Sequence, residues 1–438
     1  MAALVDQVMV SGLNFLTGVI LVRGLGLANF GKYAVAYAIL LYANSLQLSF
    51  VTAPMLSIGP LQEPGRRHMY LEGMYAVQVL SSIFLLTAVA VFGLVATLFT
   101  RFFDFPFIVA FACCVGTFQL QDWLRRYYLL QRRGVSAILT DSISYLGQVI
   151  LLFLLWHANR LSLFTTFVAM AVTSFGGFLM GPFSGELKLR GQHLRMAWQE
   201  STAMARDLVV ANQARWFGIQ GVLIIATNIV GPPSIGGLRA TQNMTGPMNL
   251  ALLSLDNVVP ARLSEELYAR GVESAYRVAK RATIVILKAS TVMVPVIIFG
   301  KPILRFIYGP EIVPFYGAMI IQVFNILLSA VGRMQFYFFR SVQEIRPVLV
   351  ANIASAIISV GIVFPLGKTL GPLGVICSST IGQLVIVGVL FSYWMRHRTR
   401  LLAGNPLRAP FANHSSVSCC ETLNDEVSRG EGSALSCE

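Results

Sequence analysis

Seven ionisable residues lie inside long apolar stretches of this chain, and their types and positions make them candidates for a functional site. The basic members are Arg215, Arg239, Lys288 and Arg333, and the acidic members are Asp6, Asp141 and Asp256. A charged group is costly in hydrocarbon, so each is a candidate for binding or for proton exchange. The alternative for each is structural: an ion pair, or a side chain that reaches the membrane interface.

The four basic residues predict a cavity for an anionic group. Arg215 and Arg239 lie about 10 Å and 6 Å from opposite ends of adjacent, antiparallel apolar stretches, at 1.5 Å per helical residue. We expect them to line one wall, with Lys288 and Arg333 as weaker members of the same surface. Arginine supplies a fixed charge and a forked donor, which suits a phosphate or carboxylate.

The three acidic residues are candidate coupling carboxylates. Asp141 lies roughly 9 Å from the start of its stretch, where it could exchange a proton during transport. Asp6 and Asp256 lie near the ends of theirs, so an interfacial position explains them as well. Asp122 stands three and four residues before Arg125 and Arg126, the spacing of an intrahelical ion pair, which favours a structural role.

Composition argues against an enzyme. Hydrophobic residues make up 55% of the 438 and charged residues only 12%, against roughly 25% charged in soluble chains. The five His and six Cys form no metal-binding or disulfide pattern. No catalytic set and no nucleotide-binding motif is present, so we expect no catalytic residue, metal or cofactor. The net charge of +13 reflects membrane topology rather than nucleic-acid binding.

The apolar pattern predicts an all-α polytopic membrane protein, because backbone groups in hydrocarbon must bond to one another. Each crossing needs about 20 apolar residues. Twelve stretches qualify: 4–22, 33–58, 74–100, 107–129, 135–156, 163–181, 208–230, 235–259, 283–299, 314–339, 348–370 and 374–395.

Basic residues in the connections predict the orientation. Connections after even-numbered stretches hold 20 Lys and Arg, and those after odd-numbered stretches hold 7. Since positive charge favours the cytoplasmic side, both termini are expected there. The chain then divides into an N-lobe (1–187), a cytoplasmic linker (188–207), a C-lobe (208–396) and a polar, disordered cytoplasmic tail (397–438).

The two halves show a weak internal repeat. Residues 18–21 resemble residues 221–224, Gly31 corresponds to Gly236, and Pro54 corresponds to Pro260. The offset drifts only from 203 to 206. With six stretches in each half, the repeats would be parallel and related by an axis along the membrane normal.

Three passages carry a family resemblance. They are Gly12-Leu13-Asn14-Phe15-Leu16-Thr17-Gly18 with Phe30-Gly31-Lys32-Tyr33, Asp141-Ser142-Ile143-Ser144-Tyr145-Leu146-Gly147-Gln148, and Gly237-Leu238-Arg239-Ala240-Thr241-Gln242-Asn243 with Leu255-Asp256-Asn257-Val258-Val259-Pro260. They resemble the polysaccharide flippase branch of the multidrug, oligosaccharidyl-lipid and polysaccharide exporter superfamily. The pattern covers about residues 4–396.

The resemblance implies two six-helix lobes that form a V, with a cationic cavity between them. It implies alternating-access movement of a lipid-linked sugar, carried on a polyisoprenyl phosphate or pyrophosphate, across the bacterial inner membrane for surface polysaccharide synthesis. Expected partners are membrane lipid, the lipid-linked glycan, and a glycan polymerase or glycosyltransferases. Two alternatives stay open: a drug or organic-cation antiporter of the same superfamily, and a non-transporting scaffold of a glycan assembly complex.

Overall fold

The computed structural model describes residues 2–99, 103–183, 191–216, 220–342, 344 and 346–403. Residues 397–403 of the predicted disordered tail (397–438) are helical, because the last helix continues to Ala403. Residues 404–438 lie outside the described residues. Within the described ranges the chain is helical and contains no strand. The first half forms α1 (Ala2–Gln47), η1 (Leu48–Thr52), α2 (Ala53–Ile58), η2 (Gly59–Leu61), α3 (Pro64–Phe99), α4 (Phe105–Leu130), α5 (Gly134–Asp141), η3 (Ser142–Leu146), α6 (Gly147–His157) and α7 (Leu163–Phe183).

The second half is also helical, with short helical segments between its long helices. They are η4 (Gly191–His193), α8 (Leu194–Trp216), α9 (Val222–Asn243), α10 (Gly246–Arg270), α11 (Val272–Ala289), η6 (Ser290–Met293), α12 (Val294–Ile298), α13 (Gly300–Tyr308), η7 (Pro310–Phe315), α14 (Tyr316–Ser341), α15 (Arg346–Leu370) and α16 (Pro372–Ala403).

Helix α1 is a hairpin of two limbs rather than one rod. Asp6 pairs with Arg125 at 2.8 Å, and Asn44 donates to Asp122 at 3.3 Å, so residues 6 and 44 meet the same part of α4. A straight helix would hold them about 57 Å apart at 1.5 Å per residue. The chain turns back at Gly26, whose φ of 73° and ψ of 166° lie in a region that favours glycine.

Helix α9 repeats this turn in the second half. Gly231 has φ 78° and ψ 161°, nearly the values of Gly26. The two glycines are 205 positions apart, inside the range of offsets found from the sequence. Each half therefore begins with a helix pair that reverses at a glycine with the same backbone conformation.

The reversals account for the number of membrane crossings. Ten helical segments of the described residues are long and apolar enough to cross a membrane. Val5–Leu61 contains the turn at Gly26 and so comprises two limbs, each long enough to cross; Val222–Asn243 also reverses, at Gly231, and so belongs to two crossings rather than one. Counted in this way, the ten segments give the twelve predicted crossings, and the predicted all-α polytopic fold is confirmed.

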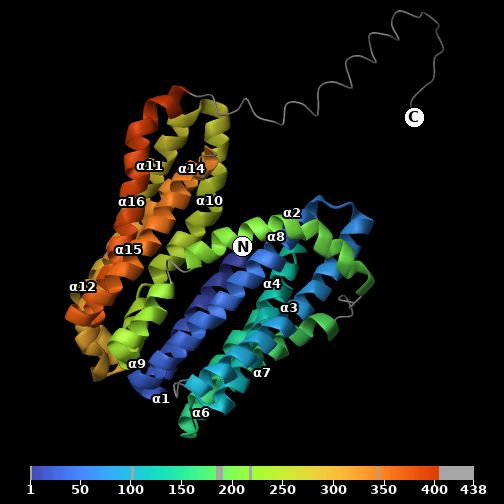
Figure 1. The fold of residues 1–438 in the computed structure, drawn as a ribbon, viewed down its shortest axis with the longest axis vertical. Helices are drawn as coiled ribbons and strands as arrows, with labels where there is room; N and C mark the ends of the chain where they lie inside the picture. Colours follow the sequence, from blue (N-terminus) through green and yellow to red (C-terminus); the bar gives the residue numbers. More distant parts are fainter. Residues whose placement is uncertain are drawn as a thin grey trace, which may run out of the picture.

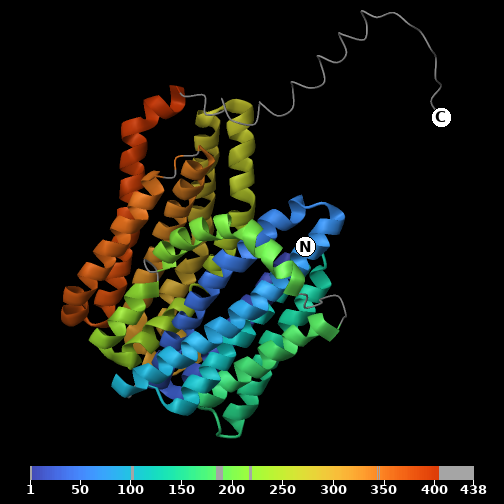
Figure 2. The same cartoon turned by 45° about the vertical axis from the view of Figure 1, so that its right-hand side comes forward.

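The crossings form two lobes arranged as a V (Figure 1). The N-lobe contains α1–α7, and the C-lobe contains α9–α16. The lobes meet through α1 and α9 at one end and stand apart at the other, where α10, α11 and α16 rise away from the N-lobe (Figures 1 and 2). On α3, Phe92 and Phe99 are 75% and 82% exposed, as expected of a surface that faces lipid.

Helix α8 begins in the segment predicted as a linker and packs on the N-lobe. Tyr70 of α3 shares a hydrogen bond of 3.0 Å with Ser201, and Gln62 donates to Glu200 at 3.0 Å. The ring of His193 lies 3.1 Å from Glu72. Figure 1 shows α8 crossing from the N-lobe toward the C-lobe at the open end of the V.

Candidate functional site

A buried charge cluster occupies the N-lobe, with the guanidinium of Arg125 at its centre. Arg125 pairs with Asp6 of α1 at 2.8 Å and with Asp141 of α5 at 2.9 Å, and its distance to Asp122 is 4.0 Å. Arg126 pairs with Asp122 at 2.8 Å. We call these five residues the N-lobe charge cluster. It joins α1 to the consecutive helices α4 and α5, and Arg125 lies 119 positions after Asp6 in the chain.

The ion pairs of the cluster join more helices than the sequence suggested. The spacing of Asp122, Arg125 and Arg126 predicted an ion pair within one helix, and Arg126 makes that pair. Arg125 instead makes its shorter contacts with carboxylates of two other helices. Asp6, for which an interfacial position was the alternative, is fully buried, as is Asp141.

The charges of the cluster do not balance. Three carboxylates share two guanidinium groups, which leaves one negative charge in excess if all are ionised. Oδ1 of Asp6 is buried and has no hydrogen-bond partner among the described atoms. A buried, uncompensated charge costs several kcal/mol, and one bound proton removes it. The cluster is therefore chemically suited to hold and release a proton.

Local structure positions Asp141 at an irregular point of its helix. Residues Ser142–Leu146 form one π-helical turn directly after it, between α5 and α6. A π turn shifts the helix register, and such turns are frequent at functional sites. Gln121 of α4 donates to Asp141 at 2.6 Å, so this carboxylate is fixed by both a charged and a neutral donor.

A chain of amides extends the cluster along α1 and α3, and the sequence analysis missed it. Asn44 lies 3.3 Å from Gln47, Gln47 donates to Gln78 at 3.1 Å, and Gln78 donates to Ser82 at 2.8 Å. Gln47, Gln78 and Ser82 are buried. The sequence did contain a signal for this chain of amides, because Asn44 and Gln47 stand three residues apart on one face of an otherwise apolar stretch.

The predicted basic residues occupy separate helices. Arg239 of α9 is partly buried, donates to Gln242 at 2.8 Å and lies 5.8 Å from the ring of Tyr37 across the lobe boundary. Lys288 of α11 is exposed, and Arg333 of α14 is partly buried. Arg215 of α8 lies outside the described side chains. The structure describes no direct contact among the other three.

The predicted carboxylates divide between two places. Asp6 and Asp141 meet at Arg125. Asp256 belongs to α10, and its side chain is outside those described. Among the described residues no group of three or more His, Cys, Asp or Glu is arranged to hold a metal ion.

Glycines make the contact between the lobes very close. A Cβ at Gly31 would lie 1.8 Å from the carbonyl oxygen of Pro232, and one at Gly236 would lie 2.3 Å from the carbonyl oxygen of Leu27. Backbone therefore packs on backbone, as in other helix pairs that meet through small residues. Arg23 strengthens this end by donating to the carbonyl oxygens of Phe306 and, at 2.7 Å, Ile307 near the end of α13.

An apolar cavity of about 650 Å³ lies beside this contact. Most of its lining comes from α1, α3 and α4, and Ile224, Thr227 and Asn228 of α9 complete it from the C-lobe. Phe84 and Phe92, which are 70% and 75% exposed, also line it. The cavity is therefore bounded by both lobes and borders the lipid-facing surface of α3.

Comparison with solved structures identifies the fold. An inward-facing structure of a multidrug resistance MATE family transporter of the MOP superfamily matches with a TM-score of 0.75 and 12% identity, covering 91% of this chain and 98% of that one. An outward-facing MATE structure matches with a TM-score of 0.60 and 13% identity, covering 92% and 95%.

The lipid II flippase MurJ, in an inward closed conformation, matches with a TM-score of 0.61 and 13% identity, covering 89% of this chain and 86% of that one. No protein-family model and no curated protein sequence matches the chain. These neighbours are transport proteins of low identity to this chain, so the likeness concerns the fold. The chain is a multi-pass membrane protein with the fold of these MATE transporters and of MurJ.

Proposed function

We propose that the protein is a flippase that moves a lipid-linked sugar, carried on a polyisoprenyl phosphate or pyrophosphate, across the inner membrane. The observation that carries this proposal is the apolar cavity of about 650 Å³ bounded by both lobes and by exposed side chains of α3. A lipid tail can lie there, in contact with the bilayer, while its head group occupies the space between the lobes.

The position of Arg239 is suited to binding the phosphate or pyrophosphate of this substrate. It lies at the lobe boundary, 5.8 Å from the ring of Tyr37, and its only described hydrogen bond goes to Gln242, which leaves guanidinium donors for a ligand. A phosphate in a low-dielectric cavity needs such a partner to offset its desolvation. Arg215, Lys288 and Arg333 remain candidates for the same role.

Alternating access would require each end of the V to open while the other is closed. The glycine contact closes one end, and the separation of α10 and α11 from the N-lobe opens the other (Figure 2). We expect the open end to face the cytoplasm, because the basic connections predict that orientation. The head group would bind there, and the lobes would then close behind it and part at the glycine contact. Proton exchange at Asp6 and Asp141 would bias the two states.

The MATE likeness and the buried carboxylates favour a second candidate, an antiporter of drugs or organic cations. Such a protein would use the N-lobe charge cluster but would have no need of Arg239, because a cation at the binding wall repels a cationic substrate. The two candidates therefore predict opposite effects of removing Arg239.

Reconstitution into liposomes separates them. We expect the protein to move a fluorescent polyisoprenyl-pyrophosphate disaccharide, followed by protection from a membrane-impermeant quencher. Arg239→Ala should slow this about tenfold or more, because a charge-assisted hydrogen bond contributes about 1.5–3 kcal/mol. Arg305→Ala, which removes an exposed cation of α13, is the matched control.

Ethidium is tested in parallel in the same liposomes. Ethidium transport that survives Arg239→Ala, with no movement of the lipid-linked sugar, would replace the flippase by the antiporter. Movement of neither substrate by a folded protein would favour a scaffold of a glycan assembly complex.

A further inference from the structure

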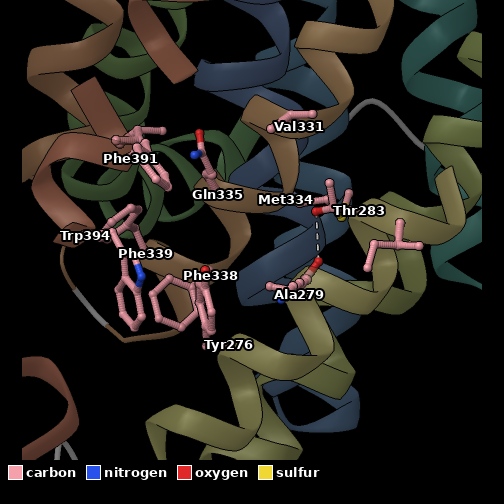
Figure 3. A pocket seen from close by; sticks show the side chains of 13 residues that line it. Tyr276, Ala279, Thr283, Val331, Met334, Gln335, Phe338, Phe339, Phe391 and Trp394 are labelled. Carbon is pink, nitrogen blue, oxygen red and sulfur yellow. Dashed lines mark hydrogen bonds between the residues drawn. The ribbon is translucent and has the colours of Figure 1, made fainter. Parts of the chain in front are cut away.

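Helices α11, α14 and α16 leave a second cavity between them, at the end of the C-lobe where the lobes stand apart. Its volume is about 180 Å³, and most of its lining is apolar. Figure 3 shows Tyr276, Phe338 and Trp394 grouped on one side of it and Val331 on another. Neither the lobe contact nor the N-lobe charge cluster includes these residues.

Stacked aromatic rings keep this cavity formed. The rings of Tyr276 and Trp394 are stacked with centroids 4.3 Å apart, and Phe338 meets Trp394 edge-on at 5.1 Å. Such pairs favour one relative orientation, so the wall does not collapse into the space. Ile284 and Phe391 at the edge of the cavity are 43% and 52% exposed, so it opens on the surface of a membrane-spanning lobe.

One basic residue lines the cavity, and two more lie close to it on the same helix. Lys280 lines the cavity, and Arg277 and Arg281 stand beside it on α11; all three are exposed. No ion pair is described for any of them. The aromatic and basic residues together mark the level of the lipid head groups, where Trp, Tyr, Lys and Arg gather.

From this combination we infer that the cavity binds one anionic phospholipid. An acyl chain fills the apolar space against Tyr276 and Trp394, and the phosphate lies at Lys280. Basic pockets between membrane helices bind anionic head groups on electrostatic grounds. A zwitterionic lipid such as phosphatidylcholine also carries a phosphate, but its choline cation cancels the net charge that Lys280, Arg277 and Arg281 would attract. A free phosphate has no chain for the apolar wall. The inference does not depend on what the protein transports.

Binding of phosphatidylglycerol to the purified protein in neutral detergent tests the site. Phosphatidylglycerol with brominated chains should quench the fluorescence of Trp394 at lower concentration than brominated phosphatidylcholine. Trp394→Phe should remove that part of the quenching. Lys280→Gln should weaken phosphatidylglycerol binding about fivefold, since a cation near the surface contributes about 1 kcal/mol. Phosphatidylcholine binding should weaken less, because its head group has no net charge.

Two further variants separate the apolar and charged parts. Val331→Phe fills the cavity and should weaken binding of the chain while circular dichroism and gel filtration stay normal. Arg305→Gln removes an equally exposed cation of α13 and should change nothing. Equal affinity for both lipids, or an unchanged affinity in Lys280→Gln, would overturn the inference. Full competition by glycerol 1-phosphate, which has no chain, would do the same.

Discussion

Replacing Gly31 by Ala should open the end of the V where the lobes meet. The added Cβ would lie 1.8 Å from the carbonyl oxygen of Pro232, and this neighbour is helix backbone, which cannot rotate away. Overpacking of this kind costs about 1–3 kcal/mol. The cost falls only on the state in which the lobes touch, so the ratio of closed to open states at this end should fall about 5- to 150-fold.

Distances between spin labels report this ratio. With the six native Cys replaced, labels at residues 158 and 311 lie in exposed connections near the lobe contact, one in each lobe. Labels at 65 and 268 are exposed at the other end. In Gly31→Ala the first distance should lengthen and the second should shorten, because the lobes rock about a common axis.

A matched glycine on the same helix is the control. A Cβ at Gly12 would meet nothing within 4 Å, so Gly12→Ala should leave both distance distributions unchanged. Gly236→Ala should act like Gly31→Ala, because its Cβ would lie 2.3 Å from the carbonyl oxygen of Leu27. Unchanged distances in both Gly31→Ala and Gly236→Ala would show that this packing does not hold the closed end.

Four other predictions concern stability and topology. Arg125→Ala should destabilise the protein by about 3–5 kcal/mol, seen as a lower thermal midpoint, because it leaves buried carboxylates without a partner; the more exposed Arg126 should matter less. Gly73→Val should detach the start of α8, since a Cβ there would lie 2.4 Å from the carbonyl oxygen of His193, and trypsin should then cut that segment faster. Truncation after residue 402 should leave transport intact at equal membrane abundance. A Cys at position 198 should react with an impermeant thiol reagent from the cytoplasmic side only.

The overall fold could be predicted because its signals are long and redundant. Twelve apolar stretches specify this architecture, since the bilayer fixes both the length of a crossing and the cost of charge within it. The basic connections predict only the orientation, which stays a prediction. The turn at Gly231 lies 205 positions after the turn at Gly26, an offset within the range of the weak repeat, although the repeat itself identified neither turn. The same pattern of apolar stretches therefore predicted the helices of both halves.

The contacts of the site could not be predicted in the same way. Asp6 and Arg125 are 119 positions apart, and only the three-dimensional packing of α1 against α4 brings them together. Spacing along one helix correctly identified the ion pairs of Asp122 with Arg125 and Arg126. It could not show that Arg125 lies closer to Asp6 and Asp141. The amide chain from Asn44 to Ser82 was overlooked because neutral polar residues carry no charge signal.

The charge cluster and the lobe contact share one rigid element, which gives a physical route between them. Asp6 and Gly18 both belong to the first limb of α1, before the turn at Gly26. A Cβ at Gly18 would lie 2.5 Å from the side chain of Asn243, so this limb also packs on the C-lobe. Twelve residues, or about 18 Å of helix, separate the two positions. We therefore expect a movement of Asp6 relative to Arg125 to displace this limb where it packs against Asn243, and closure of the lobe contact to favour the paired form of Asp6.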